Sequence, residues 1–222
     1  MKKKFLKLFI IILLIIILAT LLIKFLNKRI MPIYMNYQEG EMKRLITTVI
    51  NKSINDDITS EFDVSELFIT NTNESTKTVI IDFDPVILNR VMSSISDIVY
   101  DNLKLISEKD QNTLKKYNVS DSIFYIPTGV IFKNSVFLNN LGPKIPVKME
   151  LISSVNPNIE TKVSEYGINN SLIEVFIHVN VSVRMILPTK SKEMEIVVVV
   201  PLAVKLIQGN IPENYLDNKK NS

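Results

Sequence analysis

Residues 172–187 read LIEVFIHVNVSVRMIL, and this stretch decides the fold class. Every odd-numbered residue in it is apolar, whereas the even-numbered residues mix polar and apolar side chains. Because side chains alternate between the two faces of a β-strand, the stretch predicts a long strand with one buried face and one partly polar face. His178, the one histidine of the chain, falls on the polar face.

His178 raises the question of catalysis, because histidine is the usual proton-transfer residue near neutral pH. Glu174, Asn180, Ser182 and Arg184 share its face. Ser182 lies about 13 Å away along the same strand, at about 3.3 Å per residue, which is beyond hydrogen-bond reach. Only a partner from another strand could complete a catalytic triad. The sequence also has no glycine-rich phosphate loop and no HExxH motif, so we predict an exposed strand residue and no enzyme.

Further strands are predicted around this one, and the short links between them favour antiparallel pairing. The last strand is apolar on both faces at residues 196–200, which predicts a central or covered position in the sheet. The predicted strands, from their alternation and their flanking turn residues, are 67–71, 77–83, 123–126, 130–133, 147–155, 159–166 and 194–207.

Two amphipathic helices are predicted before the strand-rich half. Met31-Pro32 is expected to break the preceding apolar helix, and Asn55-Asp56-Asp57 to end the first amphipathic one. Asp84-Pro85 is typical of a helix start, because aspartate caps free N–H groups and proline suits the first helical position. The predicted buried stripes are Met42, Leu45, Ile46, Val49, Ile50 and Ile54 in one helix, and Leu88, Val91, Met92, Ile95, Ile98, Val99 and Ile106 in the other.

The fold class is therefore α+β: an N-terminal transmembrane helix followed by one domain of two amphipathic helices on a mainly antiparallel β-sheet. We predict residues 1–29 as the membrane anchor and residues 30–222 as an extracytoplasmic domain. No cofactor is predicted, and the absence of cysteine excludes a thiolate zinc site. The acidic pairs Asp56/Asp57 and Asp82/Asp84 could touch a cation, but a helix end and a helix cap explain them more simply.

The anchor rests on residues 8–23, LFIIILLIIILATLLI, which are apolar apart from Thr20. About 20 such residues span a bilayer as a helix. A cleaved signal peptide is the rival interpretation, but its apolar region is shorter and a small-x-small cleavage site follows it. Residues 24–29 offer no such site. We take the membrane-facing positions as Leu8, Ile12, Ile16 and Leu22.

Charge is distributed unevenly along the chain. Seven of the 26 Lys and Arg residues lie in residues 1–29 with no acidic residue, so the remainder has 19 basic and 23 acidic residues, a net of −4. A mildly acidic domain argues against nucleic acid as a partner, since phosphate binding requires a basic surface. Lys2, Lys3 and Lys4 favour a cytoplasmic N-terminus in a single-pass protein, although Lys24, Lys28 and Arg29 favour the opposite orientation.

Five segments carry a family resemblance in their order and spacing: PTG (127–129), LGPKIPV (141–147), YGINNSLIEV (166–175), VPLAV (200–204) and IQGNIPENY (207–215). Together they resemble the YunB family of sporulation proteins from endospore-forming Firmicutes. The resemblance covers most of the chain from about residue 30. It implies a protein made in the mother cell during sporulation and placed in the mother-cell membrane or the outer forespore membrane, and it supplies no catalytic residue.

Two functions follow as hypotheses. In the first, the exterior domain is a non-catalytic interaction module that binds another sporulation protein. In the second, it is a lipid-binding domain with an apolar groove beside the bilayer. The loop residues of the five family segments could stabilise turns of the fold or be recognised by a binding partner. These residues are Gly142, Pro143, Pro146, Gly167, Asn169, Gly209 and Pro212.

Overall fold

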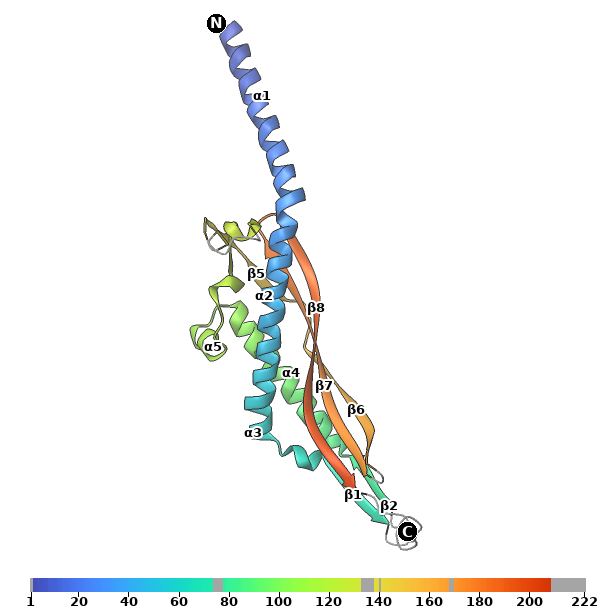
Figure 1. The fold of residues 1–222 in the computed structure, drawn as a ribbon. Coiled ribbons are helices and arrows are strands. Elements are labelled where there is room, and N and C mark those ends of the chain that lie inside the picture. Colours follow the sequence, from blue (N-terminus) through green and yellow to red (C-terminus); the bar gives the residue numbers. More distant parts are fainter. Residues whose placement is uncertain (1, 74–77, 133–137, 140, 168–169, 209–222) are drawn as a thin grey trace. The chain divides into compact units, whose positions relative to one another are not determined.

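A computed structural model describes residues 2–73, 78–132, 138–139, 141–167 and 170–208 (Figure 1). The chain is α+β, with an apolar N-terminal helix and antiparallel strands. The helices are α1 (Lys2–Phe25), α2 (Met31–Lys52), α3 (Thr59–Glu61), α4 (Pro85–Ser107) and α5 (Gln111–Lys116). The strands are β1 (Phe68–Asn73), β2 (Thr78–Phe83), β3 (Tyr125–Pro127), β4 (Lys144–Pro146), β5 (Lys148–Leu151), β6 (Asn156–Tyr166), β7 (Asn170–Leu187) and β8 (Lys190–Gln208).

The contacts divide the chain into two compact units. The first comprises Met1–Leu45, Asn118–Glu150 and Arg184–Met194, and the second comprises Ile46–Tyr117, Leu151–Val183 and Glu195–Ser222. The proposed boundary between an anchor of residues 1–29 and a domain of residues 30–222 stays a prediction.

The apolar helix does not end at Met31-Pro32, so that prediction was wrong. A π-helical segment, Leu26–Ile30, joins α1 directly to α2 (Figure 1). Pro32 occupies the second residue of α2. A helix tolerates proline in its first turn, and the wider π-turn before it changes the hydrogen-bonding register that proline would otherwise interrupt. The predicted end at residues 55–57 was wrong as well, because a second π-helical segment, Ser53–Ile58, continues into α3.

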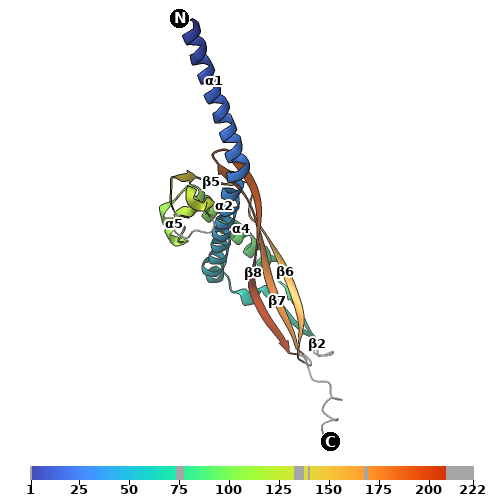
Figure 2. The same cartoon turned by 45° about the horizontal axis from the view of Figure 1, so that its top comes forward.

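The sheet built on β7 follows the predicted alternation. The odd-numbered residues from Ile173 to Leu187 are buried, and the even-numbered ones are intermediate. β6 pairs antiparallel with β7, with Ile159 opposite Ile177 and Tyr166 opposite Asn170. The sheet order is β5-β7-β6, and β8 pairs with β7; Figures 1 and 2 show β6, β7 and β8 side by side. β1 and β2 form a separate antiparallel pair, as predicted.

The second unit is built around α4. Its buried residues are Val91, Ile95, Val99, Leu103 and Ile106, all on one stripe. The unit also buries Ile46, Val49, Ile50 and Ile54 from the helix that enters it. Ser96 of α4 donates a hydrogen bond to the Val155 carbonyl at 2.8 Å, which ties the helix to the start of β6. Burying these aliphatic side chains stabilises the unit by about 1.5–3 kcal/mol each.

Asp84 caps α4 as its sequence context predicts. Its carboxylate accepts hydrogen bonds from the backbone N–H groups of Val86 at 2.8 Å and Ile87 at 3.3 Å. Asp84→Ala should therefore lower the free energy of unfolding by about 1 kcal/mol, because these donors lose their partner. Urea unfolding of the full chain in detergent micelles measures the change, with Asp97→Ala on the exposed side of α4 as the control. Equal effects of the two substitutions would contradict the capping role.

Candidate functional site

His178 lies on the mixed face of β7, where its Nε2 atom is 2.6 Å from the Oε2 atom of Glu160 on β6. The register places Asn158 directly opposite His178, so Glu160 reaches it along the diagonal. The His178 side chain is 29% exposed and that of Glu160 is 63% exposed. A carboxylate can orient an imidazole, but nucleophilic catalysis also needs a hydroxyl or thiol within about 3 Å. The contacts recorded for the described residues bring no such group to His178.

We expect the His178–Glu160 pair to contribute little to stability. Exposed ion pairs are worth about 0.2–1 kcal/mol, so His178→Gln should lower the free energy of unfolding by no more than about 1 kcal/mol. The neighbouring Ile177 points to the other face and is fully buried. Ile177→Ala is the matched control and should cost about 2–5 kcal/mol in the same urea titration. A loss for His178→Gln as large as the control's would indicate that the pair has a structural role we have not assigned.

Three of the four residues of the acidic pairs, Asp57, Asp82 and Asp84, have partners within the fold. Asp84 caps α4, and Asp82 accepts a hydrogen bond from the Phe83 N–H at 2.8 Å. Asp57 lies 3.1 Å from the ammonium group of Lys116. Among the described residues, no group of three or more histidine, cysteine or acidic side chains is arranged to hold a metal ion.

The motifs PTG and LGPKIPV, which lie apart in the sequence, form one closed loop in the first unit. The Thr128 N–H donates to the Pro143 carbonyl at 3.1 Å, and the Gly129 N–H donates to the Leu141 carbonyl at 2.9 Å. β3 and β4 pair directly beside this loop, with Tyr125 opposite Pro146. Residues 128–131 form a 3₁₀ helix, so the predicted strand at 130–133 was wrong. The turn there is stabilised by these contacts, which come from a distant part of the sequence.

Two of the predicted loop residues have a clear conformational requirement. Gly142 has φ +93°, and an added Cβ would come 2.3 Å from the Thr128 hydroxyl. Gly167 has φ +76° in the turn between β6 and β7, with open space around it. Pro143 and Pro146 are exposed, whereas Asn169, Gly209 and Pro212 lie outside the described residues. A role of these positions in binding stays a prediction.

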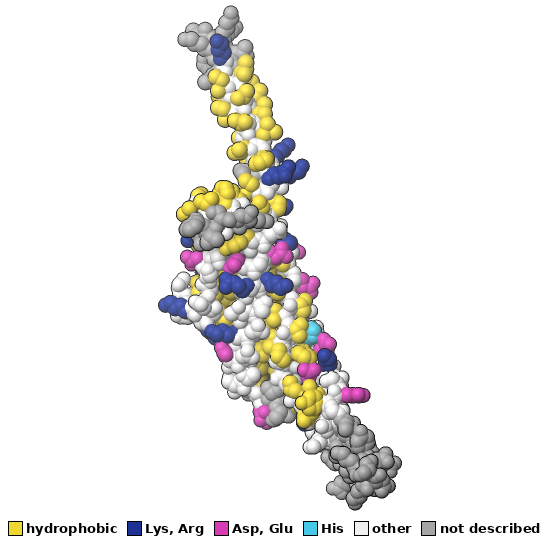
Figure 3. Space-filling model, viewed as in Figure 1, with side chains coloured by type: hydrophobic (Ala, Val, Ile, Leu, Met, Phe, Trp, Pro, Cys, Tyr) yellow, Lys and Arg dark blue, Asp and Glu magenta, His cyan; other side chains and the backbone are white. Residues whose placement is uncertain are grey.

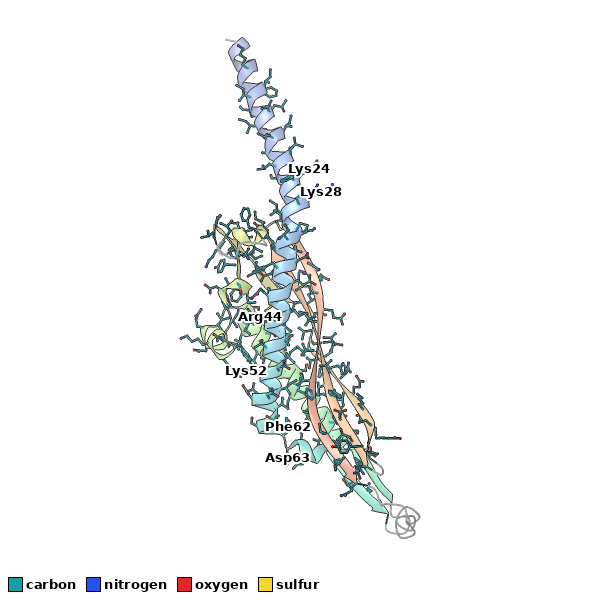
Figure 4. The ribbon with its side chains drawn as sticks, viewed as in Figure 1. Lys24, Lys28, Arg44, Lys52, Phe62 and Asp63 are labelled. Atoms are coloured by element: carbon teal, nitrogen blue, oxygen red, sulfur yellow. The ribbon has the colours of Figure 1, made fainter. Side chains whose placement is uncertain are left out.

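Glu41 of α2 links this helix to the segment that precedes β3. Its Oε2 atom accepts hydrogen bonds from the Ser122 hydroxyl and from Arg44, both at 2.7 Å. Partial burial by itself raises the pKa of Glu41, but the hydrogen bonds from Ser122 and Arg44, together with the positive charge of Arg44, outweigh it and leave the pKa below its ordinary value. Figure 4 labels Arg44 on this part of the helix.

The lowered pKa of Glu41 predicts a pH dependence. Its contribution to stability is present above the ordinary carboxyl pKa of the unfolded chain and is lost as the pH falls through the lower pKa of the folded state. The difference in free energy of unfolding between the wild type and Glu41→Gln should therefore shrink between about pH 5 and pH 3. Urea midpoints measured across this range test it, and a difference that stays constant would contradict the assignment.

The predicted anchor positions lie on α1. Ile12, Ile16 and Leu22 are 48%, 54% and 59% exposed, and Leu8 belongs to the same helix. The helix that contains α1 is long and apolar enough to cross a membrane, and none of its most apolar window is buried. Figure 3 shows its hydrophobic side chains exposed along α1, with basic side chains at the end that leads into α2.

The outer face of β8 is less covered than its sequence predicts. Ile196, Val198 and Val200 are buried, but Val197 and Val199 are each 50% exposed. In the described part of the chain β8 pairs with β7 and lies at the edge of the sheet, so the predicted central position was wrong. Within the described ranges, no layer covers these two valines, although strands that are apolar on both faces are usually covered on both sides. The result is an apolar strip on an edge strand.

Comparisons with known proteins agree on one family. The family model described as "Sporulation protein YunB" matches residues 123–214. The chain is 34% identical over 190 residues to the "Sporulation protein YunB" of Bacillus subtilis (strain 168), an alignment that covers 86% of this chain and 73% of the relative. No solved structure matches the chain.

Proposed function

The chain belongs to the YunB family of sporulation proteins, and on this premise we propose that it is a membrane-anchored, non-catalytic protein whose exterior domain acts as an interaction module during endospore formation. Family membership supports the role in sporulation.

The long apolar helix α1 is the observation that carries the proposal of a membrane anchor. α1 has 24 residues, which at about 1.5 Å per residue gives about 36 Å, longer than the hydrocarbon core of about 30 Å. Its apolar side chains are exposed, so water would be an unfavourable environment for them and lipid a favourable one. Lys24 and Lys28 project from the helix near its end (Figure 4), where ammonium groups can reach lipid headgroups.

The orientation follows from the basic N-terminal tail. Lys2, Lys3 and Lys4 favour retention of the N-terminus in the cytoplasm. All residues after α1 would then lie on the other side of the membrane. In a sporulating cell this places the domain outside the mother-cell membrane, or between the two forespore membranes if the protein resides in the outer one.

The apolar strip of β8 is the surface that we assign to a protein partner. An exposed edge strand offers unpaired backbone donors and acceptors, and Val197 and Val199 add apolar area beside them. Together these features suit the addition of an extended segment of another sporulation protein. Among the described residues, the contacts of His178 and of the paired aspartates include no nucleophile beside the histidine and no metal-binding cluster, and we therefore favour binding over catalysis.

Site-specific crosslinking in sporulating cells tests this role. A photoreactive residue placed at Val197 or Val199 should yield a discrete protein adduct, whereas the same residue at Val86 or Val163 should not. These control positions are also exposed and apolar, at 63% and 64%. No adduct at β8, combined with a full yield of heat-resistant spores after deletion of the gene, would count against an interaction module.

Lipid binding is the alternative function, and the half-exposed valines of β8 are the observation that favours it. The domain can be purified without detergent, extracted with organic solvent and analysed by mass spectrometry. The fragment should begin at Ile30, because Met31, Tyr34 and Met35 are buried and belong to the fold. Stoichiometric phospholipid would support a lipid-handling domain, whereas a folded, lipid-free fragment supports the interaction module.

A further inference from the structure

The first unit exposes large apolar side chains outside α1, on the loop that joins β3 to β4. Phe132, Leu138 and Leu141 are 51%, 41% and 57% exposed. They flank residues 133–137, which lie outside the described residues. We call these three residues the apolar loop cluster. Exposed apolar side chains that gather in one place usually mark a surface that is covered in the functional state.

The backbone of the loop holds the cluster outward. Gly129 is buried beneath the loop, and an added Cβ would come 1.8 Å from the Leu138 carbonyl oxygen and 2.7 Å from that of Leu141. The Leu141 N–H also donates to the Leu138 carbonyl at 3.1 Å. With its inner side filled by backbone, the loop leaves its leucine side chains on the outer side.

One hydrogen bond within the same unit locates this loop relative to the anchor. The Tyr34 hydroxyl donates to the Thr128 carbonyl at 3.0 Å, at the start of the loop. Tyr34 follows Phe25, the last residue of α1, by only about 13 Å along the helix, at about 1.5 Å per residue. The Thr189 hydroxyl also bonds to the side chain of Asn27 at 2.8 Å, so the turn between β7 and β8 lies against the end of the anchor.

The interfacial region of the bilayer is the environment that suits an apolar cluster close to the end of α1. The headgroup region is about 5–7 Å thick on each side of the hydrocarbon core, so it covers about half of the distance of about 13 Å between Phe25 and Tyr34 along the helix. Figure 3 shows hydrophobic side chains gathered beside the foot of α1, next to basic ones. Lys28 and Arg29, both exposed, suit anionic headgroups at the same level.

We propose that the apolar loop cluster is a second membrane contact, in which Phe132, Leu138 and Leu141 enter the interfacial region of the bilayer that α1 crosses. The inference rests on the anchoring role proposed above. With two contacts the first unit is held at a fixed orientation on the membrane surface, whereas α1 alone would let it tilt. The occupant of the cluster is therefore phospholipid and not a protein.

Fluorescence of the full chain in phospholipid vesicles tests the proposal. The chain has no cysteine, so single-cysteine variants of Phe132, Leu138 and Leu141 can each carry one environment-sensitive fluorophore. Ile16→Cys reports on the anchor. Lys43→Cys is the aqueous control, because Lys43 is exposed on α2 about 27 Å beyond Phe25.

Labels on the cluster should show blue-shifted emission, strong quenching by headgroup-nitroxide lipid and protection from aqueous iodide, whereas the Lys43 label should show the reverse. The second contact would be overturned if the cluster labels behaved like the Lys43 label while the Ile16 label was quenched by the lipid. A protein partner would then be the expected occupant of the cluster. Quenching of the Ile16 label by aqueous iodide would instead contradict the membrane anchor, and with it the second contact.

Discussion

The double substitution Ile12→Arg/Ile16→Arg should release the full chain from the membrane. Each arginine at the centre of a membrane helix costs about 2.5–3.5 kcal/mol, so the pair opposes insertion by about 5–7 kcal/mol. The two positions lie one helical turn apart on α1, which leaves little room for both charges to reach the headgroups. After carbonate extraction, we expect the variant in the soluble or aggregated fraction. The wild type should remain in the membrane fraction.

The conservative pair Ile12→Leu/Ile16→Leu is the matched control and should stay in the membrane, because leucine is equally favourable in lipid. If the arginine variant also resisted carbonate extraction, α1 would not be a spanning helix. The exposed apolar side chains of α1 would then have to be covered by something other than lipid, such as a helix of a second protein.

The second large effect is expected at Gly129. Gly129→Ala places a Cβ 1.8 Å from the backbone oxygen of Leu138, and backbone cannot move aside as the end of a long side chain can. The loop between β3 and β4 must therefore open, at a cost of about 2–4 kcal/mol in the free energy of unfolding. Urea unfolding of the full chain in micelles, followed by circular dichroism, measures this loss.

Gly40→Ala is the control for Gly129→Ala. Gly40 lies in α2 with nothing within 4 Å of an added Cβ, so alanine should stabilise the helix by about 0.5–1 kcal/mol. The two substitutions are chemically identical and opposite in expected sign. A Gly129→Ala variant as stable as the wild type would show that the closed loop is not the conformation of the protein in solution.

Local patterns predicted much of the fold. The alternation in residues 172–187 predicted β7 and the side of the sheet on which His178 lies, and Asp84-Pro85 predicted the first residue of α4. These predictions succeed because strand alternation and helix capping depend on residues close together in the sequence. The apolar N-terminal helix is predicted for the same reason.

The errors have two causes, contacts between distant residues and a rare local helix geometry. The segment at 128–131 is helical because Leu141 and Pro143 accept its hydrogen bonds, which no local pattern reveals. The continuous helix through Pro32 depends on a π-turn, a rare structure with no clear sequence signal. The contact of His178 with Glu160 depends on the register between β6 and β7.

The candidate surfaces were harder to predict than the fold. Residues 196–200 are apolar on both faces, and only the structure shows that the outer one is half-exposed on an edge strand. The apolar loop cluster was not predicted at all. Leu141 directly precedes Gly142 and Leu138 lies four residues before it, but the exposure of both leucines depends on the position of Gly129 beneath them.

Topology in living cells tests the central claim most directly. The cysteine-free full chain can carry Lys3→Cys in the first turn of α1 or Val86→Cys in α4, and each variant is produced in vegetative cells, whose intact protoplasts are treated with a membrane-impermeant maleimide. The account predicts labelling of Val86→Cys in intact protoplasts and of Lys3→Cys only after lysis. Labelling of Lys3→Cys in intact protoplasts, or of Val86→Cys only after lysis, would contradict an exterior domain held by a single anchor.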